Sequence, residues 1–241
     1  VGHILFHLLP PVIRDGTLPL PHAKVVIPSE HFLPEVLHAP REERLLTYRS
    51  IVRETFAHAG SILIVVPTSI EAEKVALALQ KGIEERVILL TTTRSKRQER
   101  EAYRALEDFS QAKLIIATPS HAVIERHDIA RIIIEECRSP HYKERTRPYL
   151  DLRDVLTTYA HHTGRMLLLG DILPRTEEEY LRRSEHYLTF GQTPKRIALT
   201  GTLSVIVRDR DEKGTQGFTL FPSHLRTLLS EVQKKKKRLF V

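Results

Sequence analysis

Residues 113–136 read KLIIATPSHAVIERHDIARIIIEE, and this stretch decides the fold. It contains two short aliphatic runs, Leu114 to Ala117 and Arg131 to Ile134, and each is followed by polar residues. Neither run alternates between apolar and polar positions, which is typical of strands that are buried on both faces of a parallel sheet. The stretch therefore predicts two central strands of an α/β domain.

The same strand-like pattern recurs on both sides of this stretch. Further strands are predicted at residues 35–38, 62–66, 87–90 and 166–169, and helices at 42–58, 70–82, 96–109, 152–162 and 177–183. This alternation favours a doubly wound, mostly parallel sheet with helices on both faces. Ligands of such sheets bind beyond the carboxyl ends of the strands. We therefore expect function in the segments that begin at Ala39, Pro67, Thr118, Glu135 and Gly170.

The pattern divides the chain into three parts. Residues 1–34 are predicted to be a lead-in segment, 35–190 the main lobe, and 191–241 a connection to a second lobe. In this last part we expect a short strand at 206–207, a charged connection at 208–217 and a helix capped by Ser223. The apolar residues 239–241 resemble the start of another strand, so we expect the chain to be truncated at a lobe boundary.

Composition restricts the classes of function. The 241 residues include one cysteine, Cys137, which excludes an intramolecular disulfide and a Cys-rich zinc site, so we expect a reducing compartment and no metal held by protein ligands. A formal net charge of +7 favours a polyanionic partner. The apolar runs are far shorter than the roughly 20 residues that span a bilayer, so we expect no membrane partner.

Four segments between Lys113 and Tyr180 carry a more specific pattern. Thr118 to Ala122 stand where one helicase family has GTRSA after a strand, and Glu135 to Arg138 stand where it has DEEH. His141 to Val155 follow the spacing of SYKxxxxPxYxxRDVA, and Gly170 to Glu177 that of GSATPSxES. In these segments the chain resembles the first RecA-like lobe of the PriA-type primosomal replication-restart DNA helicases. The resemblance covers roughly residues 35–241.

The resemblance implies ATP and Mg²⁺ as the cofactors of the family, but the phosphate loop is replaced. Where the family has VTGSGKT, the chain has the seven residues from His38 to Arg44, and Glu43 takes the place of the lysine. A carboxylate repels triphosphate, and Pro40 lacks an amide that could bind it. We therefore expect no nucleotide at this degenerate Walker A segment, which includes Ala39, Pro40, Glu42, Glu43 and Arg44.

The acidic pair after the second central strand is also altered. By resemblance, Glu135 takes the position directed at the metal ion and Glu136 the position that polarises water. They are the candidate catalytic residues of a site that we expect to be inactive. The alternative is an acidic pair at a strand end with no chemical role.

Two segments are candidates for binding DNA. Thr118 and Ser120 follow a strand, where hydroxyls and amides can bind backbone phosphates, although N-capping of a short helix is the alternative. The segment from His141 to Asp154 mixes tyrosines with cations, as in sites for single strands, although a solvated basic loop is the alternative. Its candidate residues are Tyr142, Lys143, Arg145, Arg147, Tyr149 and Arg153.

The leading interpretation is a replication-restart helicase homologue that binds single-stranded or forked DNA and has lost its ATPase activity. The resemblance implies primosome or replication proteins as partners and a cytoplasmic, nucleoid-associated location in bacteria. Two alternatives remain open: a divergent but active ATP-dependent 3'-5' DNA helicase, and a generic α/β interaction domain.

Overall fold

The computed structural model describes residues 32–124, 126–147, 149–191 and 223–234. The chain forms two compact units, Val1–Lys195 and Arg196–Val241. In the second unit the structure describes helix α8 (Ser223–Lys234), so the predicted helix is confirmed. The strands expected at 206–207 and 239–241, and the connection at 208–217, lie outside the described residues.

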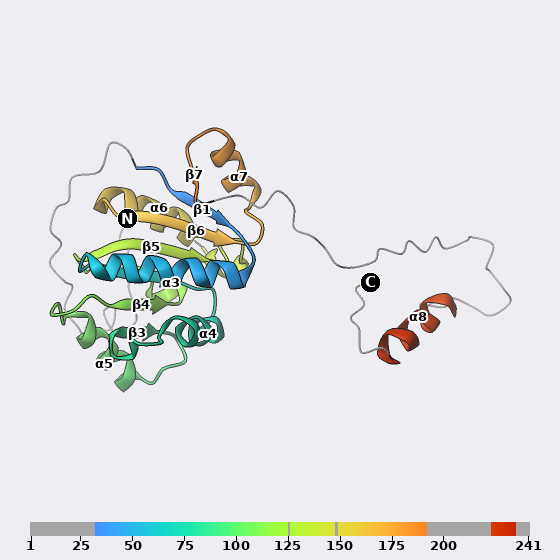
Figure 1. Cartoon of the computed structure of the whole chain (residues 1–241), viewed down its shortest axis with the longest axis horizontal. Helices are drawn as coiled ribbons and strands as arrows, with labels where there is room; N and C mark the ends of the chain where they lie inside the picture. Colours follow the sequence, from blue (N-terminus) through green and yellow to red (C-terminus); the bar gives the residue numbers. More distant parts are fainter. Residues whose placement is uncertain (1–31, 125, 148, 192–222, 235–241) are drawn as a thin grey trace. The chain divides into compact units, whose positions relative to one another are not determined.

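The first unit is built on a seven-stranded sheet whose strands are all parallel (Figure 1). Their order across the sheet is β3-β4-β2-β5-β6-β1-β7. The strands are β1 (Glu35–His38), β2 (Ser61–Val65), β3 (Val87–Leu90), β4 (Leu114–Ala117), β5 (Ile129–Glu135), β6 (Met166–Asp171) and β7 (Leu188–Thr189).

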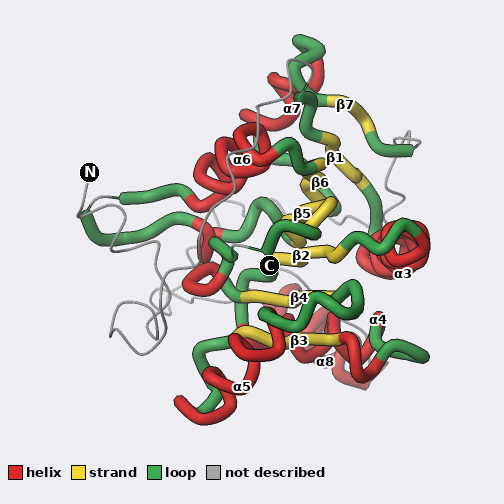
Figure 2. Tube along the Cα trace, turned by 90° about the vertical axis from the view of Figure 1, so that its left-hand side faces the viewer, coloured by secondary structure: helices red, strands yellow, loops and turns green. Residues whose placement is uncertain are grey.

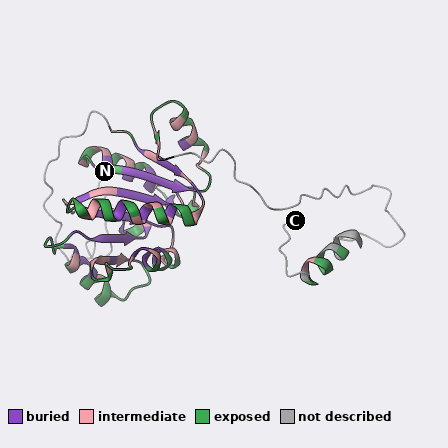
Figure 3. Cartoon of the chain, in the orientation of Figure 1, coloured by how far each residue is buried: buried purple, intermediate pink, exposed green. Residues whose placement is uncertain are grey.

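Helices cover both faces of the sheet, as Figure 2 shows. Helices α3 (Arg41–Ala57) and α4 (Ser69–Leu79) pack with one buried cluster, and α5 (Lys96–Leu106) and α6 (Leu152–Thr163) pack with the other. Helix α7 (Thr176–Arg183) connects β6 to β7. Strands β2 and β4 are buried throughout because both of their faces are covered (Figure 3). The predicted doubly wound α/β fold, with helices on both faces of a parallel sheet, is confirmed.

The parallel register brings the carboxyl ends of the strands to one edge of the sheet. Val65 lies level with Ala117 on one side and with Ile134 on the other, and Glu135 lies level with Gly170. His38 lies level with Asp171 at the end of β1. Residues far apart in the sequence, such as 39, 67, 118, 135 and 170, therefore lie along the same edge, as the sequence predicts, although 135 and 170 are still within β5 and β6.

Candidate functional site

The connection from β1 to α3 is short. Only Ala39 and Pro40 separate the last residue of the strand from Arg41, where the helix begins. Glu42 and Glu43 are exposed in the first turn, where carboxylates interact favourably with the helix dipole. The segment that resembles a phosphate loop is thus mostly helix.

At the end of β5, Glu135 is buried and fully hydrogen-bonded. Arg44 reaches it from α3, with its Nε donating to Oε2 at 2.9 Å and its Nη2 to Oε1 at 2.6 Å. Tyr48, one turn further along α3, donates its hydroxyl proton to Oε2 at 2.6 Å. The Arg44 and Glu135 side chains are 3% and 1% exposed. We call Arg44, Tyr48 and Glu135 the closed cluster.

Electrostatics stabilise the charged form of Arg44 in this cluster. Burial opposes the charge, but the ion pair with Glu135 outweighs burial and raises the pKa of Arg44. The pKa of Tyr48 is also raised, first by burial and then by the Glu135 carboxylate, so its phenol remains protonated and acts as a donor. The third guanidinium nitrogen of Arg44, Nη1, donates to the carbonyl oxygen of Ala39 at 2.8 Å.

The closed cluster does not fit a magnesium ion or a triphosphate. A metal ion needs a carboxylate with accessible oxygens, and both oxygens of Glu135 are already bound by a guanidinium or a phenol. Arg44 places a positive charge against the carboxylate where the metal ion would have to sit. The guanidinium thus serves as the counter-ion of Glu135.

Glu136 lies beside the closed cluster in a different environment. Its backbone has a φ of 50°, a left-handed conformation that costs a non-glycine residue about 1–2 kcal/mol. Its carboxylate accepts from Nη1 of Arg41 at 3.2 Å, and the same guanidinium pairs with Glu71 at the start of α4. Burial, followed by the charges of Glu71 and Glu135, raises the pKa of Glu136.

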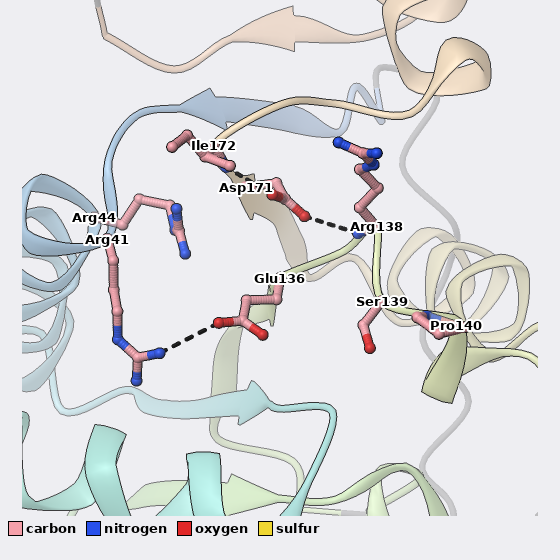
Figure 4. A pocket seen from close by; sticks show the side chains of 8 residues that line it. All are labelled: Arg41, Arg44, Glu136, Arg138, Ser139, Pro140, Asp171 and Ile172. Carbon is pink, nitrogen blue, oxygen red and sulfur yellow. Dashed lines mark hydrogen bonds and ion pairs between the residues drawn. The ribbon is translucent and has the colours of Figure 1, made fainter. Parts of the chain in front are cut away.

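Arg41, Arg44 and Glu136 line an open pocket of about 510 Å³ (Figure 4). Asp171 forms one wall, and its carboxylate accepts from the backbone amides of Arg138 and Ile172 at 2.9 and 2.7 Å. In the sequence Asp171 is only one residue of the 170–177 segment, and the structure shows that it holds two loops together. The lining residues are Arg41, Arg44, Glu136, Arg138, Ser139, Pro140, Asp171 and Ile172.

A second hollow, of about 470 Å³, follows the ends of β2, β3 and β4. We call it the hydroxyl groove because six of its nine lining residues are serine or threonine. Thr68 caps α4 by accepting from the Glu71 amide, and Ser69 lies 3.4 Å from Thr92 between their hydroxyl oxygens. The lining residues are Pro67, Thr68, Ser69, Ile70, Thr92, Thr93, Thr118, Pro119 and Ser120.

The two predicted hydroxyl residues share this groove but differ in access. Thr118 is 4% exposed, and its backbone amide donates to the carbonyl oxygen of Leu90. Its side chain forms no capping bond to the following 3-10 helix, so the alternative of N-capping is not what the structure shows. Ser120 is exposed and can meet a ligand directly.

Tyr142 and Arg153 lie in the interior, which corrects their predicted role in contacting DNA. The Tyr142 ring is 1% exposed, and its hydroxyl donates to the carbonyl oxygens of Val65 and Glu135 at 2.9 and 2.6 Å. Arg153 is ion-paired with Asp151 and donates to the carbonyl oxygen of Cys137. A buried ring cannot stack on a base. Both residues instead form packing and hydrogen-bond contacts at the base of the 143–151 hairpin.

The other candidates in that hairpin are exposed. Lys143 and Asp151 form an antiparallel bridge at its base, and Glu144 donates its amide to Leu150. Lys143, Arg145 and Arg147 are exposed, and they form no ion pair with another described residue. The Tyr149 side chain is exposed at 56% on a left-handed backbone of φ 57°.

Several residues of this edge were missed from the sequence. Thr92 and Thr93 follow the predicted strand 87–90, so the rule that ligands bind beyond strand ends could have identified them. Tyr48 lies four residues after Arg44, on the same face of the helix, but the contact of both with Glu135 could not be read locally.

No protein-family model matches the sequence, and no curated protein matches it. Solved structures do match. The UvsW helicase from bacteriophage T4 matches with a TM-score of 0.45 and 14% identity, over 65% of this chain and 54% of that chain. The C-terminal domain of Dbp5 from S. cerevisiae, bound to Gle1 and IP6, matches with a TM-score of 0.43 and 12% identity, over 66% of this chain and 88% of that chain. The likeness is one of fold.

Proposed function

We propose that the chain is a helicase-like lobe that binds single-stranded or forked DNA and does not hydrolyse ATP. The observation that carries the proposal is the contrast along one edge of the sheet. At the end of β5, Arg44 and Tyr48 donate hydrogen bonds to both oxygens of the Glu135 carboxylate, which would otherwise hold a metal ion. At β2, β3 and β4, the edge presents the open hydroxyl groove.

The groove and the hairpin suit a single strand for separate reasons. Hydroxyls at strand ends can bind phosphate oxygens of any sequence. The exposed cations of the hairpin add attraction for a polyanion, and the Tyr149 ring can stack on a base. Tyr142 connects the groove with the hairpin. Its hydroxyl donates to the carbonyl oxygen of Val65 at the end of β2, and the hairpin begins at the next residue, Lys143.

The more specific parts of the proposal rest on the resemblance to the PriA-type helicases. They are a role in replication restart, contacts with primosome or replication proteins, and a cytoplasmic location at the bacterial nucleoid. Among the described helices, none is long and apolar enough to cross a membrane.

The test combines two measurements on the full chain. Fluorescence anisotropy with labelled oligothymidylate should show binding that weakens as salt rises, and a forked DNA should bind at least as well. An ATPase assay with Mg²⁺ and DNA should show no turnover. Turnover that DNA stimulates would support the active helicase instead, and lack of DNA binding at low salt would support the generic interaction domain.

A matched pair of variants assigns the binding to the groove. Thr92→Val with Ser120→Ala removes two exposed groove hydroxyls, and each lost hydrogen bond should cost about 1 kcal/mol, so affinity should fall by roughly tenfold or more. Thr47→Val with Ser50→Ala removes two hydroxyls from α3, outside the groove lining, and should leave affinity unchanged. Equal affinities for the two variants would remove the groove from the proposal.

A further inference from the structure

We propose that helix α5 carries a second phosphate-binding surface, which continues the DNA path from the hydroxyl groove across the outside of the lobe. This surface, the α5 stripe, consists of Lys96, Arg97, Arg100 and Arg104. The inference rests on the proposed function and extends it to the length of strand that the lobe can hold.

The α5 stripe occupies one side of the helix. Lys96, Arg100 and Arg104 recur at four-residue spacing and therefore share a face, along a length of about 12 Å. The helix packs into the core through Ala102, Tyr103 and Leu106. All four cations of the stripe are exposed.

The α5 stripe begins beside the hydroxyl groove. Residues 91–95 connect the end of β3 directly to α5, and Thr92 and Thr93 in this connection line the groove. Arg94 is exposed in the same connection and extends the cationic surface toward the groove. A strand that leaves the groove over Thr93 would therefore meet Arg94 and Lys96 next.

Two charges of the α5 stripe lie where the helix dipole disfavours them. Lys96 and Arg97 lie in its first turn, at the positive end of the helix dipole, where a cation is unfavourable by about 0.3–1 kcal/mol. Like charges at four-residue spacing add a further small cost. Helix α7 shows the opposite arrangement, because Arg175, Arg182 and Arg183 pair with its own glutamates.

Most cations of the α5 stripe also have no acidic partner among the described residues. Arg97 pairs with Glu101 at 2.9 Å, whereas Lys96, Arg100 and Arg104 form no ion pair with another described residue. A row of exposed, unpaired cations that continues from a hydroxyl-lined groove is suited to the phosphates of one strand.

The test compares two matched double variants of the full chain. Lys96→Ala with Arg100→Ala removes two cations of the stripe, and alanine is a better helix former than either residue. Arg53→Ala with Lys81→Ala removes an exposed arginine and lysine from the last turns of α3 and the residues after α4. The affinity for oligothymidylate is measured over a range of salt concentrations, with a short and a long oligomer.

The stripe variant should lessen the dependence of log affinity on log salt by about 1.4, because each phosphate contact to a single strand contributes about 0.7. The loss should be larger with the long oligomer than with the short one, and the control variant should match the parent chain. Oligothymidylate binding that is the same in both variants would overturn the stripe and leave the proposed function standing. Failure of the parent chain to bind would overturn the proposed function itself, and stripe-dependent binding to anionic vesicles in that case would assign the cations to a lipid surface.

Discussion

Tyr48 and Gly170 face each other so closely that no side chain fits between them. A Cβ atom on Gly170 would overlap the Tyr48 hydroxyl oxygen and lie 3.2 Å from Oε2 of Glu135. The glycine at the end of β6 therefore leaves space for the hydrogen bond between Tyr48 and Glu135. By resemblance this glycine belongs to the GSATPSxES segment, and here it supports the closed cluster.

Gly170→Ala should lower the free energy of unfolding by about 1–3 kcal/mol, because the methyl group displaces the Tyr48 ring in a packed core. Urea denaturation measures the loss. Tyr48→Phe removes the overlapping oxygen, so the alanine should cost distinctly less in a Tyr48→Phe background. Equal costs in the two backgrounds would show that the hydroxyl is not what Gly170 accommodates.

Arg44→Ala should be among the most destabilising single changes in the lobe. It leaves the Glu135 carboxylate buried without its counter-ion, which typically costs 3–5 kcal/mol. Replacing all three members of the closed cluster, by Arg44→Met, Glu135→Leu and Tyr48→Phe, should recover most of the loss, because both buried charges of the cluster are then removed together. Urea denaturation of both variants checks this, and a triple variant less stable than Arg44→Ala would contradict it.

Most of the sheet could be predicted from the sequence because most of its strands contain short aliphatic runs. The runs at 87–90 and 114–117 were predicted with the bounds that β3 and β4 have. Strand β7 was missed because it has two residues, Leu188 and Thr189, and lies at the edge of the sheet, where no buried pattern is needed.

The site was less predictable because its contacts join distant segments. Arg44 and Glu135 are 91 residues apart, and nothing local to either residue indicates that the arginine turns inward. Tyr142 has cationic neighbours in the sequence, and this pattern alone predicts a stacking ring. Its burial depends on the 3-10 turn Pro140–Tyr142, which brings the ring under the ends of β2 and β5.

The exposure of the two hairpin tyrosines predicts different effects on DNA binding. Tyr149→Ala should weaken the binding of oligothymidylate by about 1–3 kcal/mol, because an exposed stacking ring is lost. Tyr142→Phe should leave affinity unchanged and lower the free energy of unfolding by about 1 kcal/mol, because the buried carbonyl oxygens of Val65 and Glu135 lose a donor. Tyr180→Ala is the control, since Tyr180 is an exposed tyrosine on α7. If anisotropy shows that Tyr180→Ala and Tyr149→Ala weaken the binding of oligothymidylate equally, a specific role for the hairpin is contradicted.

His121 should make the lobe sensitive to acid. Its side chain is buried at the end of the 3-10 turn Pro119–His121, where Nδ1 lies 3.1 Å from the Tyr103 hydroxyl oxygen and 3.8 Å from a Glu99 carboxylate oxygen. Burial lowers the pKa of His121 from 6.5 to about 4, despite the nearby carboxylate. Between these two values the unfolded chain binds a proton that the folded chain does not.

The free energy of unfolding should therefore fall as the pH drops from about 6.5 to about 4, with a contribution of up to about 3 kcal/mol from His121. Glu136 and Glu178 act in the opposite direction, because burial raises the pKa of each carboxyl and favours the folded state at low pH. The total curve mixes these contributions, so the informative quantity is the difference between the parent chain and His121→Gln. Urea denaturation at several pH values should show that difference shrinking as the pH falls through this window. A constant difference would mean that the pKa of His121 is the same in the folded and unfolded chains, which would contradict the effect of burial.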